Sequence, residues 1–218
     1  MIFDNNTSES LYSQNPAEIL SNLYLSSYKP AQDLILLKQL QINYILNLTG
    51  YEHNSNKLRF EFDYPPEITV KHIIMADEMK VKLSDHLNEA VEFIHNNIHN
   101  SPSNKLLVHC EAGISRSPTI VIAYLMRYHN YSLKTAYNYV KQRKNNIGPH
   151  ASFFEQLIQF EQQYKNTLIP SICLHDYLIE QMLEGAAVGF TRDEISLALK
   201  KTNNQVNQAY NLLFSSRN

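Results

Sequence analysis

The stretch LLVHCEAGISRSPTIVIAYLM, residues 106–126, places Cys110 and Arg116 on either side of a short loop between two apolar runs. The first run predicts a buried strand, and the second predicts an apolar helix. A tight loop between a strand and a helix directs consecutive backbone N–H groups toward one point, where a phosphate-sized anion can bind. The same field favours a thiolate over a thiol at the cysteine.

Three residues of this stretch fit an anion-binding loop. Gly113 lets the backbone curl where a Cβ would obstruct it. Arg116 supplies a planar fork that matches two phosphate oxygens and can follow them into the transition state. Pro118 falls in the first helical turn, where its missing N–H does no harm. We therefore interpret the loop as a reactive site, against the alternative that Cys110 is an inert core thiol.

The rest of the chain predicts an α/β fold with a central, mostly parallel sheet flanked by helices, because strand patterns alternate with helical ones. Pro30 is expected to begin the first helix, and Ser84 to cap a later one. The strands are expected over residues 17–20, 22–27, 44–49, 68–76 and 105–110, and the helices over residues 30–40, 84–100, 115–129, 132–144 and 152–164.

Composition excludes several classes of protein. The 218 residues include 19 Lys and Arg against 21 Asp and Glu, so neither nucleic acid nor a membrane surface is the expected partner. The longest apolar run, residues 119–126, is far shorter than the ~20 residues that span a bilayer. The N-terminus does not have the pattern of a secretory signal. Only Cys110 and Cys173 occur, which indicates a reducing compartment, cytoplasmic or nuclear; Cys173 is expected only to pack.

Two other groups of side chains have alternative interpretations. His95 and His99 are four positions apart on a predicted helix and could bind a metal, but without an evident third ligand an exposed helix surface is expected. Lys141, Arg143 and Lys144 could attract an acidic phosphopeptide, yet a solvated helix face is the expected explanation. The sequence therefore predicts neither a metal nor a cofactor.

The pattern His109-Cys110-x5-Arg116-Ser117 resembles the signature of the cysteine-dependent protein phosphatases, and residues 14–165 resemble their small dual-specificity branch. The resemblance implies that Cys110 attacks phosphorus and that Arg116 binds the phosphate in the ground and transition states. It implies that Ser117 assists release of the thiolate and that His109 orients the loop. The phosphate-binding loop would also contain Glu111, Ala112, Gly113, Ile114 and Ser115.

A leaving alkoxide or phenolate also needs a proton, so an acid is expected on a different loop. The family places an aspartate after the strand that precedes the long helix, and Asp77 stands there, 33 positions before Cys110. Glu78 is the alternative. Asp85 is expected to stabilise the first turn of the following helix instead.

The loop composition and the family pattern also predict the substrate. Glu111 would repel an inositol lipid with several phosphates, which favours a phosphoprotein carrying phosphotyrosine or phosphoserine/threonine. The alternative function is an adaptor that binds phosphoresidues with little turnover. One departure is His150, after Pro149, where the family usually has an asparagine that supports the site; whether His150 replaces that support is left open.

The last part of the chain predicts a separate three-helix unit. Pro170 indicates a boundary, and residues 174–214 resemble a ubiquitin-associated (UBA) domain, with ubiquitin as the implied partner. The alternative is that this segment only packs on the catalytic part. The expected domains are a flexible segment over residues 1–13, a catalytic domain over 14–165, a linker over 166–173 and the UBA-like domain over 174–214. The candidate ubiquitin-binding residues are Val188, Gly189, Phe190, Leu212 and Leu213.

Overall fold

Five short strands form a single sheet, each within a segment that the sequence predicts to be a strand. The strands are β1 (Ala17–Leu20), β2 (Leu23–Ser26), β3 (Tyr44–Asn47), β4 (Thr69–His72) and β5 (Leu106–His109). Their order is β1-β2-β5-β3-β4. β1 is antiparallel to β2, and the other three pairings are parallel. The sheet is therefore mixed and mostly parallel, with β5, the strand that leads to Cys110, at its centre.

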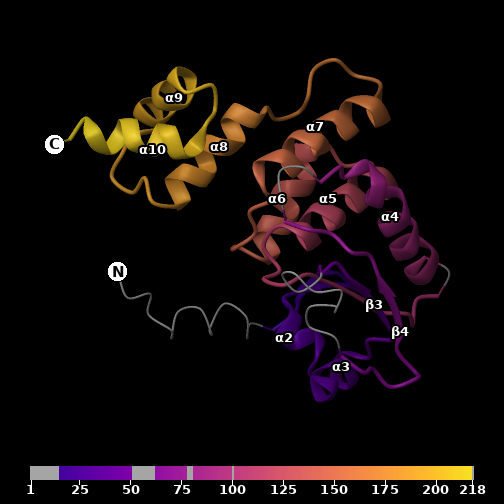
Figure 1. Ribbon diagram of the computed structural model, residues 1–218. Coiled ribbons are helices and arrows are strands. Elements are labelled where there is room, and N and C mark those ends of the chain that lie inside the picture. Colours follow the sequence, from indigo (N-terminus) through magenta and orange to yellow (C-terminus); the bar gives the residue numbers. More distant parts are fainter. Residues whose placement is uncertain (1–14, 51–61, 78–80, 100, 218) are drawn as a thin grey trace.

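Helices cover both faces of this sheet. They are α2 (Tyr28–Ala31), α3 (Leu34–Leu40), α4 (Ser84–Ile98), α5 (Arg116–Tyr128), α6 (Leu133–Arg143), α7 (Ala151–Lys165), α8 (Leu174–Glu184), α9 (Arg192–Lys201) and α10 (Val206–Ser215). Figure 1 shows α4 to α7 gathered on one side of the sheet, α2 and α3 on the other, and α8 to α10 beyond α6 and α7. None of the helices in the described part of the chain has the length and apolar character needed to cross a membrane.

The structure is a computed structural model that describes residues 15–50, 62–77, 81–99 and 101–217. Two predictions fall outside these ranges: the flexible segment over residues 1–13, and Glu78 as the alternative acid.

Two helix starts differ from the sequence prediction. Pro30 lies inside the short helix α2, and α3 begins separately after Asp33, whose carboxylate accepts hydrogen bonds from Ile35 N and Leu36 N. Asp33 is therefore the effective N-cap, because its side chain supplies the acceptor that Pro30 does not have. At α4 the N-cap is Leu83, whose backbone N–H donates to Gln156 Oε1, and Ser84 is the first helical residue.

The core consists of two apolar clusters, one on each face of the sheet. Successive residues of a strand point to opposite faces. In β5, Leu106 and Val108 accordingly join the large cluster with α4, α5 and α7, while Leu107 joins the smaller cluster with α2 and α3. All four residues of β5 are buried, so the loop that follows it begins from a fixed point.

A buried carboxylate fixes the chain between α7 and α8. Glu161 is 1% exposed, and its two oxygens accept hydrogen bonds from Leu133 N at 2.7 Å and Ser171 N at 2.8 Å. The linker is thereby tied to the start of α6.

Cys173, expected only to pack, is instead exposed and caps α8, where its sulfur accepts a hydrogen bond from Asp176 N.

Candidate active site

The candidate nucleophile lies where β5 ends, below a loop that curls over it. Cys110 is 1% exposed. Its sulfur accepts hydrogen bonds from Gly113 N and from Ser117 Oγ, both at 3.2 Å. The sulfur therefore lies at the base of the loop, where two hydrogen-bond donors from the loop and from α5 converge on it.

Gly113 holds the one conformation in the loop that requires glycine. Its φ is +71°, and a Cβ built on it would lie 2.6 Å from Ser26 O and 2.8 Å from Ser27 N. Both neighbours are backbone atoms at the end of β2, which cannot move aside without disturbing the sheet. The absence of a Cβ therefore allows the loop to lie directly against the strand ends.

Arg116 is the first residue of α5 and is held by the ends of two neighbouring strands. Its Nη1 donates to Leu48 O at 3.3 Å and to Met75 O at 3.1 Å, the residues just beyond β3 and β4. Nη2 lies 3.6 Å from a carboxylate oxygen of Glu111. A guanidinium fixed from behind in this way loses little conformational freedom when it binds two phosphate oxygens.

The structure brings Asp77 to this loop. Ser115 Oγ donates to Asp77 Oδ1 at 2.7 Å, and the other carboxylate oxygen lies 3.7 Å from Arg116 Nε. Asp85, by contrast, lies in the first turn of α4, as expected from its place in the sequence. Asp77 thus lies beside Arg116 at the phosphate-binding loop, and its role as acid stays a prediction.

His109 lies behind the loop as a neutral imidazole. It is 1% exposed, and its Nδ1 lies 3.3 Å from Cys110 O. Burial is the main cause that lowers the pKa of His109 to about 4; the Cys110 carbonyl opposes this shift, and the nearby His72 and Arg116 add to it. The ring is therefore uncharged near neutral pH and positions the backbone at Cys110.

His150 supports the loop through its backbone, which resolves the question that the sequence left open. His150 N donates to Ser115 Oγ at 3.0 Å, and Gly148 N donates to Ile114 O at 2.8 Å. The imidazole turns the other way and caps α7, where Nδ1 accepts from Ser152 N. The side chain that replaces the family's asparagine thus supports the helix, while the main chain supports the loop.

The sequence predicts a solvated helix face for Lys144, and for this residue the prediction is wrong. Lys144 is 8% exposed and donates to Asn146 Oδ1 at 2.7 Å. Burial lowers the pKa of Lys144, and its electrostatic interaction with Cys110 opposes that shift. The helical spacing of the sequence indicates this burial, since Lys144, the C-cap of α6, continues the buried face formed by Tyr137 and Val140.

The C-terminal helices reach the active-site region through α8, so the packing on the catalytic part that the sequence offered as an alternative is present in the structure. Tyr177 is 1% exposed, and its hydroxyl donates to Pro149 O. Its ring stacks on that of Phe154, with the ring centroids 3.6 Å apart. Gln181 Nε2 donates to Tyr137 OH at 3.0 Å. Helix α8 therefore packs against the segment over residues 147–150 that supports Ile114 and Ser115.

The candidate ubiquitin-binding residues divide by exposure. Val188 is 77% exposed and Leu212 is 44% exposed, whereas Phe190 and Leu213 are buried at 6% and 5%. Gly189 has a φ of +92°, and its carbonyl accepts a hydrogen bond from Arg217. The exposed members can meet a partner, while the buried ones hold the helices together.

Of the two histidines predicted on an exposed helix surface, His95 lies on α4 and is not fully exposed, and His99 is the C-cap that follows the helix. His95 is half-buried and stacks on Tyr128 with ring centroids 3.8 Å apart, while His99 is exposed. Within the described ranges, no three His, Cys, Asp or Glu side chains group as metal ligands would.

Comparison with known protein families identifies the catalytic part of the chain. The sequence model of a family described as "Dual specificity phosphatase, catalytic domain" matches residues 23–163. The chain belongs to the dual specificity phosphatase family. The matched residues run from β2 to α7 and include every candidate catalytic residue; helices α8 to α10 lie beyond them.

Individual relatives agree with this assignment. The chain is 41% identical over 146 residues to "Dual specificity protein phosphatase 7" of Homo sapiens, across 67% of this chain and 33% of that protein. It is 40% identical over 150 residues to "Dual specificity protein phosphatase 9" of Homo sapiens, across 69% of this chain and 37% of that protein. The chain thus spans about a third of the length of these relatives.

Solved structures share the fold. A crystal structure of the human "tyrosine phosphatase-like serine/threonine/tyrosine-interacting protein" superposes with a TM-score of 0.62 and is 29% identical. The match covers 69% of this chain and 98% of that one.

Proposed function

We propose that this protein hydrolyses phosphotyrosine and phosphoserine/threonine on proteins through a phosphocysteine intermediate at Cys110. The observation that carries the proposal is the pair of donors, Gly113 N and Ser117 Oγ, directed at the Cys110 sulfur beside a fixed Arg116. Family membership of residues 23–163 supports the same reaction class.

The proposed reaction proceeds in two steps, transfer of the phosphoryl group to Cys110 and hydrolysis of the phosphocysteine. The Cys110 thiolate attacks phosphorus, a P–S bond forms, and the ester P–O bond breaks while Asp77 gives its proton to the leaving oxygen. Water then attacks the phosphocysteine, Asp77 takes a proton from it, and the P–S bond breaks to release phosphate. Arg116 neutralises the phosphoryl oxygens throughout, and the Ser117 hydroxyl stabilises the thiolate as it leaves.

The nucleophile is tested by Cys110→Ser in the full chain, with an aryl phosphate as substrate. Turnover should be abolished while substrate binding persists, and EDTA should have no effect because the step uses no metal. Cys173→Ser is the matched control, since that thiol is exposed and caps α8. Retained turnover in Cys110→Ser would exclude the mechanism. An adaptor function would instead give phosphopeptide binding without turnover in the unaltered protein.

The acid is tested by the dependence on the leaving group. Asp77→Asn should slow hydrolysis of esters with poor leaving groups by about 10²–10⁴, the usual contribution of a positioned proton donor. Esters whose leaving group needs no proton should be affected much less. Asp85→Asn is the control, because Asp85 lies in the first turn of α4. The assignment fails if Asp77→Asn has no such dependence and Glu78→Gln does.

The preference for phosphoproteins rests on Glu111. Its carboxylate lies 3.6 Å from Arg116 Nη2, at the loop that would receive the phosphate. A fixed negative charge there disfavours a ligand with several phosphates, such as an inositol lipid.

The near-neutral composition and two unpaired cysteines support a cytoplasmic or nuclear location without a membrane or nucleic-acid partner.

We also propose that residues 174–214 form a UBA-like domain that directs the phosphatase to ubiquitin or ubiquitylated proteins. The exposed Val188 and Leu212 support this, because they leave apolar surface available to a partner. Titration of the full chain with labelled ubiquitin tests this proposal. Binding should shift the signals of ubiquitin, and Val188→Ser should make these shifts smaller. Leu197→Ser is the control, being 53% exposed on α9. Absence of any shift would leave only a structural role.

A further inference from the structure

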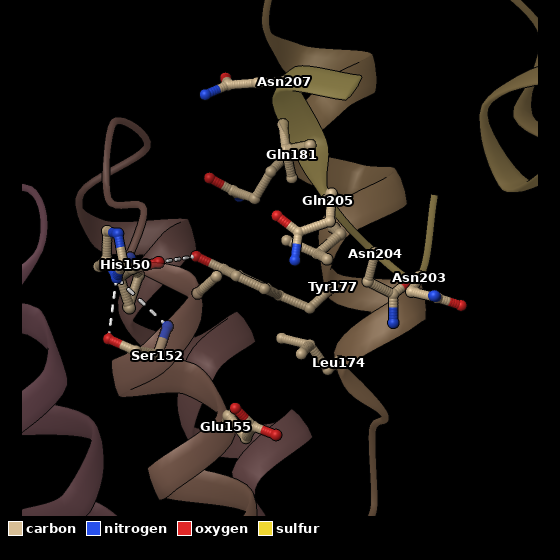
Figure 2. Close-up of a pocket in the computed structure, with 14 residues that line it drawn as sticks. His150, Ser152, Glu155, Leu174, Tyr177, Gln181, Asn203, Asn204, Gln205 and Asn207 are labelled. Atoms are coloured by element: carbon tan, nitrogen blue, oxygen red, sulfur yellow. Dashed lines mark hydrogen bonds between the residues drawn. The ribbon is translucent and has the colours of Figure 1, made fainter. Parts of the chain in front are cut away.

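A cleft of about 710 Å³ lies between the catalytic part and the C-terminal helices (Figure 2). One wall is the start of α7, the floor includes Tyr177 and Leu174 of α8, and the opposite wall is the connection from α9 into α10. Its volume is that of sites which enclose a substantial ligand. Helix α8, which contributes the floor, docks against the catalytic part through Tyr177.

The cleft lies beside the phosphate-binding loop. His150 lines it, and the backbone N–H of the same residue donates to Ser115 Oγ at 3.0 Å. Ser115 in turn donates to Asp77 at 2.7 Å. One residue therefore forms both the edge of the cleft and a support of the loop, and the cleft borders the phosphate-binding loop on this side.

The lining is rich in carboxamides and poor in charge. Each carboxamide offers one acceptor and two donors, the same groups as a peptide bond. Gln181 and Asn204 already hydrogen-bond to Tyr137 and His175. Within the described part of the chain, the side chains of the other three have no hydrogen-bond partner. The five carboxamides are those of Gln181, Asn203, Asn204, Gln205 and Asn207.

Charge limits what can bind there. Glu155 is exposed and is the single Asp or Glu among the lining residues, which include no Lys or Arg. An acidic segment would gain no counter-charge and would be repelled by Glu155, whereas a neutral or basic one would not.

We propose that this cleft binds the polypeptide next to the phosphoresidue of a protein substrate, as a segment with neutral or basic side chains held by the unpaired carboxamides. The inference rests on the proposed phosphatase activity and adds to it a site outside the phosphate-binding loop. It assigns the C-terminal helices a direct part in substrate selection.

The test compares kcat/KM of the full chain for an aryl phosphate, which has no flanking chain, and for phosphotyrosine peptides extended on either side. In the double variant Gln205→Ala/Asn207→Ala, the ratio of peptide to aryl phosphate kcat/KM should fall about tenfold for one direction of extension, as expected for the loss of two hydrogen bonds. Gln208→Ala should keep the ratio, because Gln208 is exposed on α10 and is not part of the lining.

Charge provides a second measurement. The unaltered protein should prefer peptides with lysine over those with glutamate at the flanking positions, and Glu155→Gln should reduce that preference about threefold. A ratio unchanged in the double variant for both directions of extension, or a preference for flanking glutamate, would overturn the proposal. If the unaltered protein does not hydrolyse the aryl phosphate at all, the proposed function itself is refuted. Failure of the cleft proposal and failure of the proposed function therefore give different results.

Discussion

Replacing Tyr177 tests whether the C-terminal helices support the active site. Tyr177 is 1% exposed, stacks on Phe154 at 3.6 Å and donates its hydroxyl to the buried Pro149 carbonyl. Burial raises the pKa of Tyr177, so the hydroxyl stays a donor near neutral pH. Tyr177→Phe removes only the hydrogen bond, and Tyr177→Ala removes the ring as well.

The structure sets the size of both effects. Tyr177→Phe should lower the free energy of unfolding by about 1–2 kcal/mol, because a buried carbonyl loses its donor. Tyr177→Ala should lower it by about 3–5 kcal/mol, the usual cost of deleting a buried aromatic ring. Pro149 is adjacent to His150, whose N–H supports Ser115. We therefore expect kcat for an aryl phosphate to fall about threefold to tenfold in Tyr177→Phe, equivalent to about 1 kcal/mol in the barrier.

Urea unfolding and steady-state kinetics on the same preparations measure these effects. Tyr164→Phe is the matched control, since Tyr164 is 49% exposed and its hydroxyl also donates to a backbone carbonyl, Arg127 O at 2.7 Å. It should change the free energy of unfolding by less than about 0.5 kcal/mol and leave kcat unaltered. If Tyr177→Phe behaves like Tyr164→Phe in both measurements, α8 does not support the catalytic loop.

Three further predictions concern buried groups. The pKa of His109, lowered by burial to about 4, makes the unfolded chain bind the proton first as pH falls. The free energy of unfolding should therefore drop by about 3 kcal/mol from pH 6.5 to 4, and His109→Gln should flatten that dependence; an equal slope would contradict it. Gly113→Ala should abolish turnover and cost more than about 2 kcal/mol, since φ is +71° and the Cβ would meet Ser26 O at 2.6 Å; normal kinetics would refute the loop geometry. Glu161→Gln should cost about 1–3 kcal/mol in urea unfolding, because one of the two backbone N–H groups that donate to Glu161 loses its acceptor, and a neutral result would count against the tie between linker and α6.

Local signals in the sequence determined the elements and the centre of the candidate site. Alternating apolar runs predicted all five strands, and Ser132 was correctly placed at the start of α6, where it accepts a hydrogen bond from Thr135 N. The spacing of Cys110 and Arg116, with Gly113 between them, predicted the loop. These features depend on backbone sterics and side-chain periodicity over a few residues, which any chain carries in its sequence.

Packing alone decided which distant groups meet. Lys144 is buried at the end of α6 instead of solvated, and it interacts electrostatically with the distant Cys110. The family resemblance predicts Asp77 as the acid of the site, whereas its hydrogen bond with Ser115 is visible only in the tertiary structure. Tyr177, far along the chain, lies against Pro149 because burying its ring on Phe154 removes apolar area from water. Such contacts join residues separated by many positions, and no short pattern specifies them, since their free energy depends on the shape of the assembled core.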